Sequence, residues 1–303
     1  MLDIKAQSNG GIRHSYSIFG KEKINIVIEI GLGATMGEWW HVAERLSKSN
    51  TVLLYERDRS ITVPRTPENI AKELHALLEN LNCAGKIIIV AHSQGGLYAQ
   101  QFARLYPDMT KGLVLLDPLS ANDNQYKKVL TPVEQKKSGF DKTANMILMN
   151  KLAKLHLGFV IKAVMKKAPP FYYYSDFSKD ASDYILSSIT KPEFYASALE
   201  EYNLAHEDQN TRSLAEKDGF PNIPLVLITH TSEFSINEIM EFGQTDREFA
   251  VKVENLWQSL MKEYLSFSDK TNYIQAQNSG HYIHLTEPQL IDDGIAWIED
   301  CYE

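Results

Sequence analysis

The chain has 303 residues, of which 44% are hydrophobic and 23% charged, as expected of a globular protein that buries about three quarters of its unfolded surface. Its net charge of -8 excludes nucleic acid as a general partner, because phosphate binding depends on a basic field. Cys83 and Cys301 are too few for a disulfide framework, and the first eight residues lack the apolar segment of a signal peptide. We therefore expect a reduced, cytoplasmic setting.

Short apolar runs and amphipathic segments alternate over the first 118 residues. Clusters of β-branched and apolar residues predict strands over residues 12–19, 24–30, 51–55, 86–91 and 112–116. Thr66, followed by Pro67, predicts the start of one helix, and another is predicted from residue 97 to about 106. Such alternation predicts an α/β fold, with a mostly parallel sheet covered by helices on both faces.

The alternation stops after Pro118 and resumes about a hundred residues later. The later elements are predicted as a strand over 223–228, a helix over 247–264, a strand over 272–276 and a last helix with a capping box at Thr286 and Gln289. The segment between reads as helical and irregular. The sequence therefore predicts a core domain made of residues 1–118 and 220–303, with residues 119–219 inserted as a helical unit.

The central motif is Ala91-His92-Ser93-Gln94-Gly95, where an apolar strand gives way to a helix. Small residues on either side of Ser93 permit a sharp turn that exposes its hydroxyl. The motif resembles the nucleophile elbow of the α/β-hydrolase superfamily. Four segments are also similar to a bacterial subgroup of that superfamily: residues 65–66, 73–78, 112–118 and 279–285. The resemblance implies an α/β-hydrolase fold in which residues 119–219 form a cap, or lid, over the nucleophile.

The resemblance further implies a histidine base and a carboxylate that orients it. His281 follows the last predicted strand, where the superfamily carries its catalytic histidine. Two carboxylates compete for the third role: Asp117 ends the strand after the elbow helix, and Glu233 follows the strand over 223–228. Similarity of Leu116-Asp117-Pro118 to the bacterial subgroup favours Asp117. The predicted catalytic residues are therefore Ser93, His281 and Asp117.

Backbone groups complete the predicted site. The N–H groups of Gln94, directly after the nucleophile, and Leu32, in the loop Gly31-Leu32-Gly33, are predicted to form the oxyanion hole. His92 is predicted to be structural, and His284 to pack or to line the pocket. No metal ion or organic cofactor is expected.

The cap carries the features that we expect to select a substrate. Residues 142–175 contain six lysines and no Asp or Glu. Four of the lysines are predicted to share one helical face opposite an apolar arc that includes Ile147 and Phe159: Lys151, Lys154, Lys162 and Lys166. This face is either solvated or in weak contact with an anionic membrane surface. Aromatic residues at 39–40 and 171–174 either line an acyl pocket or pack in the scaffold, and Glu200 and Glu201 are interpreted as helix-surface residues.

These features predict a serine hydrolase that cleaves an ester or related acyl bond of a small apolar or aromatic substrate. Relatives of this fold that open epoxides use a carboxylate nucleophile, so a serine at the elbow argues against that reaction. The alternative is a ligand-binding or partner-binding protein that kept the fold and lost turnover.

Overall fold

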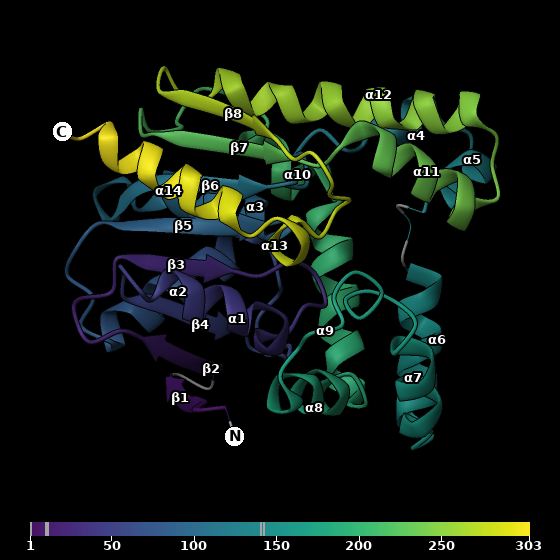
Figure 1. The fold of residues 1–303 in the computed structure, drawn as a ribbon, viewed down its shortest axis with the longest axis horizontal. Helices are drawn as coiled ribbons and strands as arrows, with labels where there is room; N and C mark the ends of the chain where they lie inside the picture. The colour runs from purple at the N-terminus through teal and green to yellow at the C-terminus, as the bar shows by residue number, and fades with distance from the viewer. Residues whose placement is uncertain (1, 10–11, 140, 142) are drawn as a thin grey trace.

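The computed structural model describes residues 2–9, 12–139, 141 and 143–303. Eight strands form one sheet in the order β1-β2-β4-β3-β5-β6-β7-β8 (Figure 1). Their bounds are β1 (Lys5–Asn9), β2 (Ile12–Phe19), β3 (Ile26–Glu29), β4 (Val52–Glu56), β5 (Ile87–His92), β6 (Thr110–Leu116), β7 (Leu225–Thr229) and β8 (Thr271–Gln275). Strands β1, β2 and β4 pair antiparallel, and all other pairs are parallel. The predicted α/β architecture with a mostly parallel sheet is confirmed.

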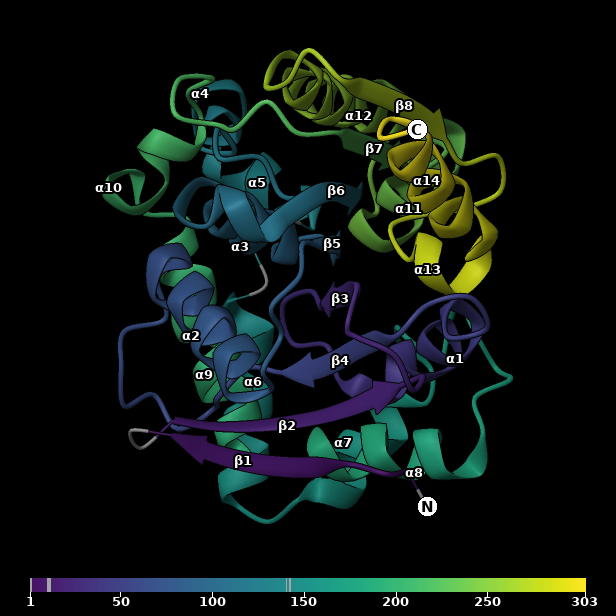
Figure 2. The same ribbon diagram turned by 90° about the vertical axis from the view of Figure 1, so that its left-hand side faces the viewer.

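Helices cover both faces of this sheet. On the core they are α1 (Met36–Leu46), α2 (Pro67–Asn80), α3 (Gly95–Leu105), α11 (Ser232–Gly243), α12 (Arg247–Glu263), α13 (Ile283–Thr286) and α14 (Gln289–Asp300). Figure 2 shows α1 and α14 on one side of the strands and α2 and α3 on the other. Because both faces are covered, the side chains of β3 to β7 are almost all buried, which explains their continuous apolar runs.

Two differences from the sequence prediction concern the edge strand and the last helix. Strand β1 pairs with β2 at the sheet edge, although its residues, KAQSN, carry no apolar alternation. The last helix begins at Gln289, and Thr286 instead ends the short helix α13. The capping-box prediction is wrong because the Thr286 hydroxyl bonds to Ser279 Oγ at 2.7 Å and to the Tyr282 carbonyl at 3.2 Å.

Seven helices occupy the described part of the chain between β6 and β7. They are α4 (Gln125–Val129), α5 (Pro132–Ser138), α6 (Thr143–Lys154), α7 (Gly158–Met165), α8 (Lys179–Ser188), α9 (Pro192–Ala205) and α10 (Asp208–Thr211). In Figure 1, α6, α7, α8 and α9 gather beyond one end of the sheet, with α6 and α7 outermost. None of the helices among the described residues has the length and apolarity needed to cross a membrane.

The predicted helix with a lysine face opposite a covered apolar arc does not form. The chain turns between α6 and α7, and the four lysines lie on or next to two helices, among exposed apolar residues. His156 adopts a φ of 56°, and the N–H groups of His156 and Leu157 close α6 by donating to the carbonyls of Ala153 and Leu152, both at 3.0 Å. Ile147 and Phe159, expected on the covered side, are exposed. Lys142, the first lysine of the basic segment, lies outside the described residues.

Candidate active site

Ser93 lies in a tight turn between β5 and α3. Its φ of 53° places it in the left-handed region, which non-glycine residues rarely adopt. A Cβ atom at Gly95 would stand 2.6 Å from the Glu29 carbonyl, so only glycine allows α3 to start this close to β3. The Ser93 N–H donates to the Leu116 carbonyl at 3.0 Å, which ties the turn to the end of β6.

Asp117 follows β6 directly and lies next to His281. Its N–H donates to the Ile228 carbonyl at 2.8 Å, and its side chain is fully buried. His281 Nδ1 is 2.6 Å from Asp117 Oδ2, although the two residues are 164 positions apart in the chain. The structure therefore brings together the histidine and the favoured carboxylate.

Glu233, the competing carboxylate, lies elsewhere. It is exposed in the first turn of α11, where both of its oxygens accept hydrogen bonds from Arg247 at 2.8 Å. These bonds lower the pKa of Glu233. Glu233 therefore pairs with an exposed arginine on α12. A different residue after β7 contacts Asp117.

That residue is His230, which was not among the predicted site residues. His230 Nδ1 lies 2.8 Å from Asp117 Oδ2, and its Nε2 lies 2.9 Å from Glu254 Oε2. Carboxylates only accept hydrogen bonds when ionised, so a ring with a carboxylate at each nitrogen is protonated at both. Burial opposes this charge, but Asp117 and Glu254 outweigh it and raise the pKa of His230 to about 10. His230 is therefore a buried imidazolium that contacts Asp117.

The environment of Asp117 favours its ionised form. Burial alone would raise its pKa, but the charge of His230 and hydrogen bonds from His230 and His281 hold the pKa well below its usual range. Trp257 Nε1 donates a further hydrogen bond to Asp117 Oδ1 at 3.2 Å. Asp117 is therefore a fixed anion beside His281 at neutral pH.

His92 and His284 support the loop that carries His281. His92 Nε2 lies 2.9 Å from the His281 carbonyl and donates its proton to it. Burial lowers the pKa of His92 to about 3, so the ring stays neutral. His284 is buried and stacks on Trp39 with ring centroids 4.1 Å apart. His284 therefore packs away from the cavity over Ser93, whereas His92 is part of the lining of that cavity.

A cavity of about 70 Å³ lies over Ser93. Its lining includes Leu32, Glu38, Ser93, His281 and, from the cap segment, Met165 and Pro170. Within the described residues, neither Leu32 N–H nor Gln94 N–H donates to a backbone acceptor. Burial raises the pKa of Glu38 to about 8, although hydrogen bonds from Thr35 oppose the shift. The pocket wall therefore carries little fixed negative charge at pH 7.

The aromatic segments pack in the scaffold. Trp39 is buried against His284, and Trp40 meets Phe19 edge-on with centroids 4.7 Å apart. Tyr173 stacks on Tyr282 at 4.8 Å and donates a hydrogen bond to Glu238. Tyr282 lines the cavity over Ser93, so Tyr173 packs behind that wall.

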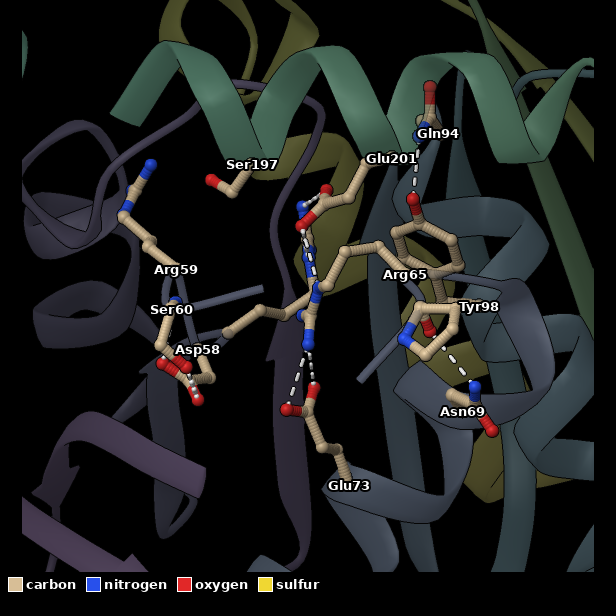
Figure 3. A network of polar contacts seen from close by, with 12 residues as sticks. Asp58, Arg59, Ser60, Arg65, Asn69, Glu73, Gln94, Tyr98, Ser197 and Glu201 are labelled. Atoms are coloured by element: carbon tan, nitrogen blue, oxygen red, sulfur yellow. Dashed lines mark hydrogen bonds and ion pairs between the residues drawn. The ribbon is translucent and has the colours of Figure 1, made fainter. Parts of the chain in front are cut away.

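A buried network of charges joins α9 to the loop over Ser93. Arg57 Nη1 donates to the Ile30 carbonyl at 2.7 Å, and Nη2 donates to the Gly31 carbonyl at 3.1 Å and to Glu201 Oε2 at 2.9 Å. Figure 3 shows Glu201, on α9, aligned with Arg65 and Glu73 in the same network. Arg65 Nη1 lies 2.8 Å from both oxygens of Glu73.

The surface interpretation of Glu201 is therefore wrong. Its side chain is buried, and although burial would raise its pKa, the charges of Arg57 and Arg65 lower it. The helix α9 turns this residue inward to meet two buried arginines, a tertiary arrangement that helical spacing does not reveal.

Comparison with known proteins identifies the family and the fold. A family model described as "Alpha/beta hydrolase family" matches residues 31–293. An "AB hydrolase superfamily protein" of Gibberella zeae is 26% identical over 290 residues, covering 88% of this chain and 83% of that protein. The (lyso)-N-acylphosphatidylethanolamine lipase of Mus musculus is 30% identical over 106 residues, which cover 32% of this chain and 31% of that one.

A solved structure shares the fold. The epoxide hydrolase CorEH without ligand superposes with a TM-score of 0.65 at 18% identity, covering 99% of each chain. The resemblance predicted from the elbow motif is confirmed by the family match and by this fold. The chain belongs to the alpha/beta hydrolase family.

Proposed function

We propose that this hydrolase cleaves an ester or related acyl bond of a small, neutral, apolar or aromatic substrate, as a carboxylesterase or lipase does. Ser93 is the nucleophile, His281 the base and Asp117 the orienting carboxylate. The observation that carries the proposal is the 2.6 Å contact of His281 Nδ1 with Asp117 Oδ2, made by a histidine that lines the same cavity as the strained Ser93.

The proton path follows from that contact. Because His281 Nδ1 donates its proton to Asp117, the neutral ring leaves Nε2 free to accept the proton of the Ser93 hydroxyl. The serine oxygen then attacks the acyl carbon, and the Leu32 and Gln94 N–H groups hold the negative charge on the carbonyl oxygen. His281 returns the proton to the leaving alcohol, and water releases the acyl group by the same steps.

Two features support acyl transfer over epoxide opening. First, the residue at the elbow is a serine. A serine attacks a carbonyl carbon and forms an ester that water hydrolyses, whereas the opening of an epoxide uses a carboxylate to attack a ring carbon. The similarity to a mammalian lipase, although limited to 106 residues, is to a protein whose name states an acyl substrate. Glu38 in the pocket wall has a pKa raised to about 8, so it carries little negative charge at pH 7, which favours neutral substrates.

Labelling with a fluorophosphonate tests the proposed chemistry directly. We expect the native protein to react and the modification to map to Ser93, because the reagent requires a serine that a neighbouring base activates. Ser93→Ala and His281→Ala should both abolish labelling. If the folded wild-type protein does not react at any pH, the protein is not a serine hydrolase, and the ligand-binding alternative holds.

His230 provides a further test through pH dependence. His230→Gln removes the positive charge beside Asp117, so the pair formed by His281 and Asp117 takes up protons at higher pH. We expect the acid limb of kcat/KM for a short ester to move up by about one pH unit. The double variant with Glu254→Gln, which also removes the carboxylate left without its partner, should move the limb only part of the way back, because the positive charge beside Asp117 is still absent.

The same histidine should also affect stability in a defined direction. Its pKa is raised in the folded protein from 6.5 to about 10, so its stabilising contribution is complete below pH 6.5 and is lost as the pH rises through 10. The difference in unfolding free energy between wild type and His230→Gln should shrink over that range. Two results together would show that His230 is neutral in the folded protein: an acid limb of kcat/KM that His230→Gln leaves unchanged, and a difference in unfolding free energy that stays constant with pH.

A further inference from the structure

Helices α6 and α7 present a surface that mixes exposed apolar and exposed basic side chains. We define the α6–α7 surface by five apolar residues and five lysines: Ile147, Leu148, Leu155, Phe159, Val164, Lys151, Lys154, Lys162, Lys166 and Lys167. We propose that this surface docks the protein on an anionic lipid bilayer, with the apolar side chains entering the interface and the lysines meeting the headgroups.

The local fold holds these side chains outward. Their inner neighbours Ala153 and Ile161 are buried, and they pack with residues of α8 and α9, including Leu186 and Phe194. The turn at His156 closes α6 and lets α7 start again, so both helices keep one covered side and one open side. The exposed apolar residues therefore cannot reach the core without unfolding this unit.

The exposure of the apolar side chains is unusual for this molecule. Phe159 is 72% exposed and Leu155 is 67% exposed, the highest values among the large hydrophobic residues that the structure describes. Both lie at the junction of α6 and α7, which Figure 1 shows at the outer edge of the molecule. Transfer of such side chains from water to a lipid interface is favourable in proportion to their area.

The charge of the surface selects an anionic partner. Residues 143–175 contain no Asp or Glu, although the whole chain has a net charge of -8. None of the five lysines makes an ion pair with a carboxylate among the described residues. An anionic bilayer therefore attracts this surface and repels the acidic remainder, which fixes the orientation of docking.

The composition favours a bilayer over a protein partner. The cores of protein interfaces are depleted in lysine, because burying an ammonium group is costly. At a bilayer, a lysine keeps its charge among the headgroups while its aliphatic stem covers apolar surface. Five lysines interspersed with five apolar residues fit the second arrangement.

The position of the surface relates it to the pocket, and this step rests on the proposed function. Met165, next to the exposed Val164, lines the cavity over Ser93, as do Pro169 and Pro170. The segment that would meet lipid thus continues directly into residues that form part of the pocket wall. Docking would present the pocket to acyl substrates that partition into the membrane.

Vesicle co-sedimentation of the full chain tests the proposal. We expect binding to vesicles of phosphatidylcholine mixed with phosphatidylglycerol, weakening as salt is added, and much weaker binding to phosphatidylcholine alone. Leu155→Ser with Phe159→Ser should lower the bound fraction by about tenfold, as should glutamine at Lys151, Lys154, Lys162 and Lys166. Matched controls are Val133→Ser, at an apolar residue of α5 that is 65% exposed, and Lys21→Gln with Lys23→Gln.

The outcomes separate the docking surface from the catalytic site. Turnover of a soluble short ester should be unchanged in all these variants, so loss of vesicle binding with normal turnover supports docking alone. Failure of wild type to bind either vesicle, or equal loss in the control variants, would overturn the proposal. Self-association in analytical ultracentrifugation that Phe159→Ser abolishes, without vesicle binding, would assign the surface to a second copy of the chain.

Discussion

Ser93→Ala is expected to lower the turnover of a short-chain ester by on the order of a thousandfold or more, because no other group takes over covalent attack. The strained backbone at Ser93 serves to expose this hydroxyl, and alanine fits the same turn without new contacts. The Michaelis constant should change little, since the pocket wall is intact. Steady-state kinetics of kcat and KM, with circular dichroism to verify folding, measure the effect.

The controls make this result specific. His281→Ala should cause a loss of similar size, and the double variant should be no worse than either single one, because nucleophile and base act as a unit. Ser197→Ala, at a buried serine of α9 whose hydroxyl donates to the Phe194 carbonyl at 3.3 Å, should leave turnover nearly unchanged. Substantial activity in Ser93→Ala would mean that a different nucleophile operates.

Asp117→Asn is expected to reduce kcat by about ten thousandfold, whereas Glu233→Gln should leave it within a factor of about two. An amide at position 117 can donate to His281 Nδ1, which favours the tautomer whose proton faces the serine. It also cannot stabilise the imidazolium that forms during attack. Glu233→Gln only removes an exposed ion pair with Arg247, which contributes little.

Kinetics and stability must be measured together for Asp117, because its carboxylate also balances the charge of His230. If Asp117→Asn lowers the melting temperature but keeps kcat, Asp117 is a structural anion only. A rate loss confined to Glu233→Gln would assign the acid to the first turn of α11 and require α11 to move during catalysis.

The sheet and its elbow could be predicted from sequence because their determinants are local. A parallel strand buried on both faces is a continuous apolar run, as at residues 87–91, and the elbow requires small residues at fixed offsets from Ser93. Strand β1 was missed because it lies at an edge, where its partner β2 supplies hydrogen bonds and little apolar burial is needed.

The pairing of the candidate site residues could be predicted only in part. Asp117 directly follows one predicted strand and His281 comes five residues after another, so parallel strands suffice to place them near one edge of the sheet. The buried positions of His230 and Glu201 could not be predicted, because each residue is held by partners far away in the sequence. Glu254 holds His230, and Arg57 and Arg65 hold Glu201. A histidine that directly follows β7, where the superfamily usually has its acid, is the feature that could have drawn attention.

The Arg57 network has a consequence for exchanging substrate specificity between relatives. Arg57 holds the carbonyls of Ile30 and Gly31 while its charge is balanced from α9 by Glu201. If the segment between β6 and β7 came from another enzyme and supplied no carboxylate at this place, Arg57 would keep its buried ion pair with Glu29 but would lose the one from α9, and Arg65 would lose the same partner. This segment is therefore tied to the core through Glu201, and a chimera that exchanges it should keep a carboxylate at that position.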